Sequence, residues 1–343
     1  MRLFIDRTAM LVAVLAALAL QSAPAHAAPI GASDDGPGVY LKLAESVPLS
    51  VDEAAQALED ALLGSGWNVA TRMDCGVDAS ACDFRSHVIV AYTDAHVDRL
   101  MAYGINAAFA VPIRFVVWED EGGVHVGATN PMNLNRTIVD EESQPDDWAD
   151  IAQEIRDVAG AAFPESVVTG EYGQARSKSR IGRTMGIMAG GKFEGKVEHV
   201  LDFTSTAIEP PRLADVLATQ MGSVAGEWDW GTQAVYVIDF PEQNAALVGV
   251  SGSRIESKSF DIVASGGVDD RKDLACPGID HAAAYPIEVL ISRDGDNIRI
   301  SLVDEMYRMK MFFEDAGKMA FAKNMAMPGS IEDEIRDKIK AIF

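Results

Sequence analysis

Soft metal ligands are concentrated towards the carboxyl end of the chain. Residues 306–327 hold six of the 14 methionines, namely Met306, Met309, Met311, Met319, Met325 and Met327. Thioethers are soft ligands, and close methionines beside a cysteine or histidine suit Cu(I). A cysteine and a histidine precede this segment, so a candidate site for copper or haem is the set Cys276, His281, Met306, Met309 and Met311. The alternative is that these methionines fill gaps in a core that is also rich in phenylalanine.

The three cysteines could carry redox chemistry. Cys75 and Cys82 lie close together in a segment that also contains Gly, Asp and Ser, which predicts a local disulfide between them. Cys276 is then left over, and an odd thiol in an exported protein is buried, paired between chains or reactive. If it is reactive, the chain would be a thiol-dependent protein of sulfur metabolism that acts through Cys276.

Other patterns for catalysis are weak. The run Gly249-Val250-Ser251-Gly252 does not complete a nucleophile-elbow motif, and turn residues rather than a helix are expected after Ser251. Gly186–Phe193 matches only part of a phosphate loop, because Phe193 replaces the residue that binds magnesium. No paired metal-ligand spacing links the other histidines, His87, His96, His125 and His199. No catalytic residue is predicted, and the sequence points away from an enzyme.

The first residues of the chain predict export. Arg2 and Arg7 lead into the apolar run Ala9–Leu20, which is followed by the small-x-small cleavage signal Ala25-His26-Ala27. This pattern is typical of a secretory signal peptide, so residues 1–27 are expected to be removed and the mature protein to be periplasmic. A span needs roughly 18 to 20 apolar residues, so no transmembrane segment is expected in the mature chain.

The chain is strongly acidic, with a formal net charge of −23. Proteins bind nucleic acid through cations that neutralise phosphate, so nucleic acid is excluded as the expected partner. One stretch departs from this acidity, because residues 174–193 contain five basic residues and no acid. It is predicted to be a solvated connector, with contact to acidic surfaces or to an anionic partner as the alternatives.

A repeated segment indicates how the chain is organised. Tyr103–Val117 returns, displaced by 174 positions, as Pro277–Ile291, with six of fifteen positions identical. A period this long indicates two copies of one domain. We expect the copies to pack as a pseudo-dimer within one chain. The expected boundaries are a signal peptide over 1–27, a first domain over 38–164, a basic Gly-containing linker over 165–196 and a second domain over 197–343.

Each copy alternates strand and helix patterns. The first copy predicts a helix capped by Ser50, a hairpin about Glu121-Gly122-Gly123 and a final helix over 146–161. The second predicts a hairpin about residues 294–297 and a last helix that begins at Ser330. The predicted fold class is therefore α+β: two repeated α/β sandwich domains, each a mainly antiparallel sheet with helices on one face.

Two segments resemble a known family. They are the hairpin that follows a run of small residues and a proline, and the ending Met325–Ile339 (MAMPGSIEDEIRDKI). With them the chain resembles the domain-of-unknown-function family 302 over about Tyr40–Ala161, and more loosely in the second copy. The resemblance implies compact α+β domains that are often dimeric and are common in bacteria. The family has no established activity, so it implies no catalytic residues.

Together these features favour an exported, non-enzymatic binding or interaction protein built of two related domains. The expected site is the cavity or face between the copies, and the expected partner is a small molecule or an envelope protein. Two alternatives stay open. One is handling of Cu(I) or haem by the Met-rich second domain, and the other is thiol-dependent sulfur metabolism at Cys276.

Overall fold

The structure is a computed structural model that describes residues 36–75, 83–139, 145–176, 190–266, 276, 278–317, 320, 322 and 324–343. The predicted signal peptide, Cys82, Met319 and residues 177–189 of the predicted linker lie outside the described residues. Within the described ranges, no helix combines the length and the apolar character that crossing a bilayer requires.

The first half of the described chain is built on an antiparallel sheet with strand order β2-β3-β4-β5-β1-β6. Its strands are β1 (Tyr40–Val47), β2 (Asn68–Cys75), β3 (Ser86–Tyr92), β4 (Ile113–Asp120), β5 (Gly123–Thr129) and β6 (Val167–Tyr172). Its helices are α2 (Val51–Gly64), α3 (Asp94–Met101), the 3-10 helix η1 (Ile105–Ala110), α4 (Pro131–Val139) and α5 (Pro145–Ala162).

The second half is built on an antiparallel sheet with strand order β7-β11-β10-β9-β8. Its strands are β7 (Val197–Thr204), β8 (Gln233–Phe240), β9 (Ala245–Ser251), β10 (Ile287–Asp294) and β11 (Asn297–Val303). Its α-helices are α6 (Pro210–Gln220), α7 (Ser253–Gly266), α8 (Glu305–Phe313) and α10 (Ala326–Ile342). Short 3-10 helices are η3 (Phe193–Lys196), η4 (Met221–Ser223), η5 (Pro241–Gln243), η7 (Ile279–Ala284) and η8 (Glu314–Ala316).

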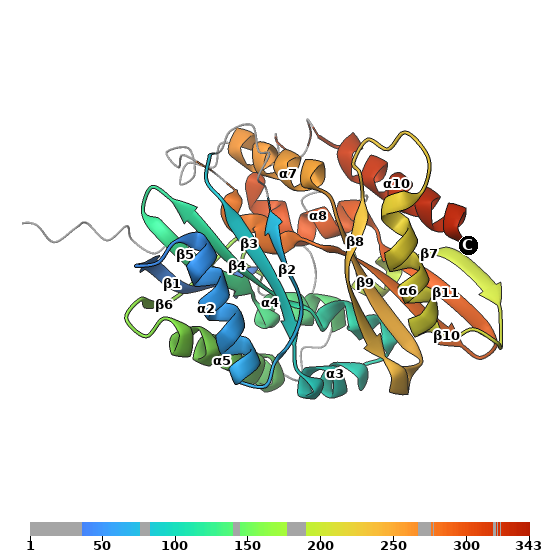
Figure 1. Cartoon of the computed structure of the whole chain (residues 1–343), viewed down its shortest axis with the longest axis horizontal. Coiled ribbons are helices and arrows are strands. Elements are labelled where there is room, and N and C mark those ends of the chain that lie inside the picture. The colour runs from blue at the N-terminus through green and yellow to red at the C-terminus, as the bar shows by residue number, and fades with distance from the viewer. Residues whose placement is uncertain are drawn as a thin grey trace, which may run out of the picture. The chain divides into compact units, whose positions relative to one another are not determined.

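The two halves repeat the same order of elements. The strand order β2-β3-β4-β5-β1 in the first sheet corresponds to β8-β9-β10-β11-β7 in the second. The helices between equivalent strands also correspond, because α2 and α6 each follow the first strand of their half (Figure 1). The 3-10 helices η1 and η7 each precede the hairpin. The predicted α+β fold of two sandwich-like halves is confirmed, as are the hairpins β4–β5 and β10–β11.

Each sheet carries helices on one face. In the first half α2 contacts β2, β3 and β4, while α5 contacts β1 and α2. In the second half α6 contacts β8, β9 and β10, and α10 contacts β7 (Figure 1). Helix α2 begins as predicted, because Ser50 and Glu53 form a capping box, and it buries the stripe Val51, Ala54, Ala55, Leu58 and Leu62.

Strand β6 corrects one predicted boundary. It lies inside the segment predicted to be a linker, yet it pairs with β1 and brings Tyr172 opposite Tyr40. Backbone groups on the outer side of β1 need hydrogen-bond partners, and β6 supplies them. Among the described strands β7, the counterpart of β1, pairs with β11 alone.

Each half contacts the other half through a 3-10 helix. Helix η7 of the second half contacts β3, β4 and β5, and η1 of the first half contacts β9 and β10. Two tyrosines of the first half donate hydrogen bonds across the same contact: Tyr40 to the carbonyl oxygen of Phe312 at 3.1 Å and Tyr172 to that of Asp280 at 2.8 Å. Residues just before each hairpin are therefore buried between the halves.

Candidate binding site

Two buried charges of opposite sign meet between the halves. Arg114 is the second residue of β4 and Glu288 the second residue of β10, and the repeat makes these positions equivalent. Their side chains are 3% and 5% exposed, and Arg114 Nη2 forms an ion pair with Glu288 Oε1. Removing either partner would leave a buried charge without compensation. The pair is therefore a specific link between the halves.

Arg308 of α8 supplies a second cation to the same carboxylate. Its Nε lies 3.7 Å from Glu288 Oε2, and its Nη2 donates to the carbonyl oxygen of Pro286 at 2.6 Å. The Arg308 and Arg114 guanidinium groups lie 4.9 Å and 5.3 Å from the centroid of the Phe312 ring. One carboxylate thus serves two permanently charged guanidinium groups, which gives the cluster a net charge of about +1.

A small cavity, partly open to solvent, lies beside this cluster, and the centres of water molecules can occupy about 20 Å³ of it. Its charged lining residues are Arg114, Glu288 and Arg308. Much of the remaining wall is apolar and comes from both halves and from η3, including Phe109, Leu134, Ile138, Phe193, Met311 and Phe312. The structure thus contains a cavity between the halves, where the sequence places the candidate site.

Three residues that line the cavity have a buried side-chain nitrogen without a hydrogen-bond partner among the described residues. These atoms are Nε of Arg114, Nε of Arg308 and Nδ2 of Asn135, and the residues are 3%, 4% and 2% exposed. The hydroxyl of Thr129, another lining residue, already accepts from the backbone N–H of Arg114 at 3.1 Å. Leaving a buried donor unpaired costs about 1–3 kcal/mol, so these donors are a local cost of packing charged and polar side chains between the halves.

Helix α4 holds Asn135 at the cavity. It begins at Pro131, whose fixed φ suits the first turn, and the side-chain oxygen of Asn130 accepts from the backbone N–H of Met132 at 3.0 Å. Asn130 Nδ2 also donates to the carbonyl oxygen of Gly38 at 2.8 Å, and Asn133 Nδ2 to that of Pro37 at 2.7 Å. These bonds fix α4 to the segment before β1, and with it the lining residues that α4 carries.

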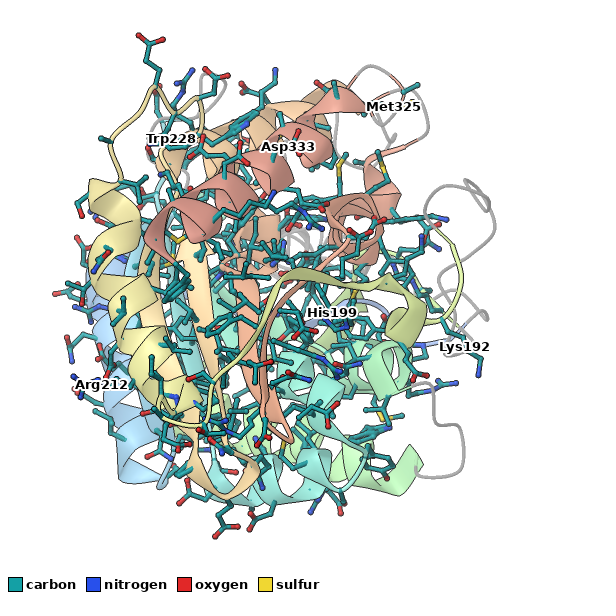
Figure 2. All side chains as sticks on the ribbon, turned by 90° about the vertical axis from the view of Figure 1, so that its right-hand side faces the viewer. Lys192, His199, Arg212, Trp228, Met325 and Asp333 are labelled. Atoms are coloured by element: carbon teal, nitrogen blue, oxygen red, sulfur yellow. The ribbon has the colours of Figure 1, made fainter. Side chains whose placement is uncertain are left out.

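The side chain of Arg176 links α4 to α8 through hydrogen bonds. It is the first basic residue of the predicted connector, yet it is 5% exposed. Nη1 donates to Asn133 Oδ1 at 2.8 Å, and Nη2 donates to the carbonyl oxygen of Lys310 at 2.8 Å and lies 3.4 Å from Glu314. The predicted contact with an acidic group is confirmed for Arg176, and the prediction of solvent exposure is wrong for it. Lys192, at the other end of the stretch, projects outward (Figure 2).

Two members of the predicted metal set are engaged in other interactions. Cys276 is disulfide-bonded, so the predictions that need its free thiol, as a metal ligand or in sulfur metabolism, are wrong. His281 is fully buried, with Nδ1 2.9 Å from Asp280 Oδ1 and Nε2 3.1 Å from Asp315 Oδ1. Its ring also stacks on Phe313 at 5.6 Å between centroids. Both imidazole nitrogens thus face carboxylates.

The methionines of the predicted set face different surroundings. Met311 lines the cavity between the halves, whereas Met309 lines a second cavity inside the second half. Met306 is only partly buried. Among the described residues no group of three or more His, Cys, Asp or Glu side chains could hold a metal ion. The structure therefore does not gather the five predicted ligands, and the positions of Met309 and Met311 fit the alternative of packing.

Cys75 corrects the predicted disulfide. Its thiol is free and fully buried at the end of β2, so the predicted pairing with Cys82 is wrong for Cys75. Sγ lies 4.0 Å from the carbonyl oxygen of Ala282, across the contact between the halves. Burial raises the pKa of the Cys75 thiol well above its ordinary value, and the charge of Glu256 raises it further. A buried, protonated thiol is a poor nucleophile.

The second cavity lies among α7, β10, α8 and α10 and is also partly open to solvent, with about 20 Å³ that the centres of water molecules can occupy. Arg308 lines both cavities, and Glu305 adds a buried carboxyl group whose Oε1 has no hydrogen-bond partner among the described residues. Burial raises the pKa of Glu305 to about 8. The positive charge of Arg308 opposes this shift, and the negative charge of Glu332 adds to it. Glu305 is therefore mostly protonated at neutral pH.

The sequence did not identify the residues of the cavity wall, although one signal was present. The repeated strands begin IRFVV and IEVLI. Each of these apolar runs contains one charged residue at the same position, and the two charges, Arg114 and Glu288, have opposite signs. A charge in a buried strand requires a partner, and the equivalent charge of the other copy was available. Asn135 and Arg308 gave no such signal, because their burial depends on how the halves pack.

Comparison with known proteins identifies the first half. Residues 43–162, from within β1 to the end of α5, match the family model of DUF302, a domain of unknown function. The resemblance noted in the sequence is therefore confirmed for this segment. The crystal structure of an uncharacterized conserved DUF302 protein from Bacillus stearothermophilus is similar at 14% identity and a TM-score of 0.30, over 37% of this chain and 96% of that chain. No curated protein matches the chain.

Proposed function

We propose that this protein is an exported, non-enzymatic binding protein that holds a small molecule in the cavity between its halves. One observation carries the proposal: both halves line a partly open cavity whose wall combines apolar side chains with the charged residues Arg114, Glu288 and Arg308. Apolar walls with a few placed polar groups are typical of small-molecule sites. The export part rests on the leader pattern of residues 1–27.

The contacts of the candidate nucleophiles support a binding role. Cys75 is buried with a raised pKa, and Cys276 is held in a disulfide. Ser251 is 2% exposed and donates a hydrogen bond to the carboxylate of Glu256. Helix α7 begins two residues after Ser251, so the expected turn there is wrong, but none of the described contacts of Ser251 supplies the histidine base that a serine nucleophile uses.

We also propose that the halves are two copies of one domain, packed as a pseudo-dimer. The common strand order and the reciprocal contacts of η1 and η7 support this. In a two-fold dimer of identical domains, equivalent residues near the axis meet their own copies. Here the equivalent residues are Arg114 and Glu288, so the contact is attractive because the copies differ in charge.

A cavity-filling substitution tests the binding proposal. Leu134→Trp places a larger ring in the wall, whereas Leu63→Trp makes the same change at a site that is 55% exposed. Overpacking costs about 1–3 kcal/mol, so thermal melting is used to confirm that both variants fold. We expect native mass spectrometry and solvent extraction of protein isolated from cells to show a small molecule in the wild type and in Leu63→Trp, and none in Leu134→Trp.

The contrary results are equally clear. A ligand that remains in folded Leu134→Trp at the wild-type level would place it elsewhere. Absence of any ligand from all three proteins, together with no binding from added small molecules, would end the proposal.

A further inference from the structure

We infer that the free edge of β7 binds the same edge of a second copy of this chain, so that two sheets join into one continuous antiparallel sheet. Strand β7 is the last strand of the second sheet, and among the described strands it pairs with β11 alone (Figure 1). Its His199 lies on the side of the molecule that faces the viewer in Figure 2. Unpaired backbone groups of an edge strand are a template for another strand.

The first half shows that a strand of this shape accepts a further strand. The repeat of 174 positions makes Gly127 and Ser301 equivalent. Gly127 lies opposite Lys42 of β1, and Ser301 lies opposite His199 of β7. The register shifts directly after Lys42 and directly after His199, so the two strands carry equivalent β-bulges. Because β6 pairs with the outer edge of β1 across this bulge, the bulge of β7 is no barrier to pairing.

The backbone hydrogen bonds at the two ends of β7 show which of its groups face outward. The N–H of Ser205 donates to the carbonyl oxygen of Asp296 at 2.9 Å, so Ser205 points towards β11. The carbonyl oxygen of Lys196 accepts from the N–H of Asp304 at 2.8 Å, so Lys196 also points towards β11. In an antiparallel ladder such residues alternate with residues whose N–H and C=O groups point away. Counted from each end to the bulge, the outward residues are Val197, His199, Asp202 and Thr204.

These outward residues are self-complementary when two copies meet antiparallel about a two-fold axis. With the axis at the bulge, His199 lies opposite Asp202 of the second copy, and Val197 lies opposite its Thr204. Residues in this arrangement exchange both their N–H and C=O hydrogen bonds with the residue opposite. The two-fold axis repeats every contact and closes the assembly at two copies, because each copy then has its β7 edge occupied.

The side chains of this register are also complementary. Nδ1 of His199 lies 3.0 Å from Oγ of Ser301, which leaves Nε2 to meet the Asp202 carboxylate of the second copy. Polar side chains that lie directly opposite and interact favourably stabilise a pair of antiparallel strands. The two-fold axis forms this histidine–aspartate pair twice.

The two acidic residues of β7 do not oppose the pairing. Glu198 lies opposite Leu302 of β11 and Asp202 lies opposite Arg299, so the two acids project from opposite faces of the sheet. Each acid also has a cation in its own half, because Asp202 lies 3.5 Å from Arg299 and Glu198 forms an ion pair with Arg336. In the inferred register neither acid lies opposite an acid of the second copy.

One substitution removes an outward hydrogen bond and leaves the ladder with β11 intact. Asp202→Pro deletes an N–H that points away from β11, a position at which an edge strand tolerates proline. Asp202→Ala removes the same side chain but keeps the N–H, so it is the matched control. Analytical ultracentrifugation of the full chain over a range of concentrations should show dimers of the wild type and of Asp202→Ala. We expect the dimer dissociation constant of Asp202→Pro to be at least about thirtyfold higher than that of Asp202→Ala, because the symmetric interface loses one hydrogen bond from each copy.

Hydrogen exchange tests the same surface in the unsubstituted protein, and therefore also decides the matter if Asp202→Pro fails to fold. Exchange of the β7 backbone amides is followed by mass spectrometry at low and at high protein concentration. We expect the amides of Val197–Thr204 to exchange more slowly at high concentration. The amides of β6, which is also an edge strand, should exchange at the same rate at both concentrations.

The results that support the inference are a wild-type dimer, concentration-dependent protection of β7 and a weaker dimer of folded Asp202→Pro. A wild type that stays monomeric at every concentration overturns it, and so does a dimer in which β7 gains no protection. A dimer of folded Asp202→Pro as tight as that of Asp202→Ala also overturns it. Protection of β7 by a different co-purified protein on a monomeric chain overturns the second copy as the occupant.

Discussion

Glu288→Gln is expected to lower the free energy of unfolding by about 3–5 kcal/mol, the range typical of removing one member of a buried ion pair. The amide keeps the size of the side chain but removes the charge that serves both Arg114 and Arg308. Two guanidinium groups then remain buried between the halves without a carboxylate. Urea denaturation at pH 7, followed by tryptophan fluorescence, measures the loss.

A surface pair provides the matched control. Glu59 pairs with Arg72 at 2.8 Å, with side chains that are 23% and 35% exposed, so Glu59→Gln should cost no more than about 1 kcal/mol. The double variant Arg114→Met/Glu288→Met should lose less free energy of unfolding than its two single variants lose in sum, because the two side chains interact. Similar losses for Glu288→Gln and Glu59→Gln would show that the buried cluster does not hold the halves together.

Glu305→Gln is expected to stabilise the protein increasingly as the pH rises. In the folded protein the pKa of Glu305 is raised to about 8, from an ordinary value of 4.5. Between these values the unfolded chain gives up the proton while the folded chain keeps it, so wild-type stability falls as the pH rises through this window. The slope is about 1.4 kcal/mol for each pH unit. Glutamine is neutral in both states and removes this slope.

The size of the effect follows from that slope. Relative to the wild type, Glu305→Gln should gain about 3 kcal/mol between about pH 5 and pH 7.5, measured by urea denaturation at each pH. Glu242→Gln, at an exposed position, should follow the wild-type curve. If the curves of Glu305→Gln and the wild type stay parallel across the window, Glu305 does not keep a raised pKa in the folded protein.

Local signals made several elements predictable from the sequence. The two turns contain Gly123 and Gly295, whose φ angles of 112° and 60° favour glycine, and both hairpins form where expected. The side chains of Ser50 and Glu53 each accept a hydrogen bond from the other's backbone N–H at the start of α2. This signal depends only on residues that are close in sequence. The repeat of 174 positions indicated two halves of one architecture, and the strand orders agree with it.

Two helices departed from expectation for identifiable reasons. Helix α7 was not predicted because it contains several serines, and serine favours turns. In the helix the hydroxyl groups of Ser257 and Ser259 donate to the backbone carbonyl groups four residues earlier. Helix α10 was expected to start at Ser330 but starts at Ala326. Pro328 therefore lies in its first turn, where the missing N–H has no helical partner to lose.

The site was harder to predict, because it depends on how distant segments pack. Met309 and Met311 are two residues apart in sequence, yet a helix turns them towards different cavities. Spacing alone therefore suggested a shared ligand set that the fold separates. The surroundings of Cys75 also come from a distant segment, because its Sγ lies 4.0 Å from the carbonyl oxygen of Ala282, 207 positions away.

The most direct test of a ligand site between the halves uses those same methionines. With ¹³C-labelled methionine methyl groups, the small molecules extracted from protein isolated from cells are added back to ligand-free protein while NMR follows Met311, in the cavity between the halves, and Met309, in the second cavity. A saturable shift of the Met311 signal with little change at Met309 is the predicted result. A shift confined to Met309, or no shift of either signal, would contradict a ligand site between the halves.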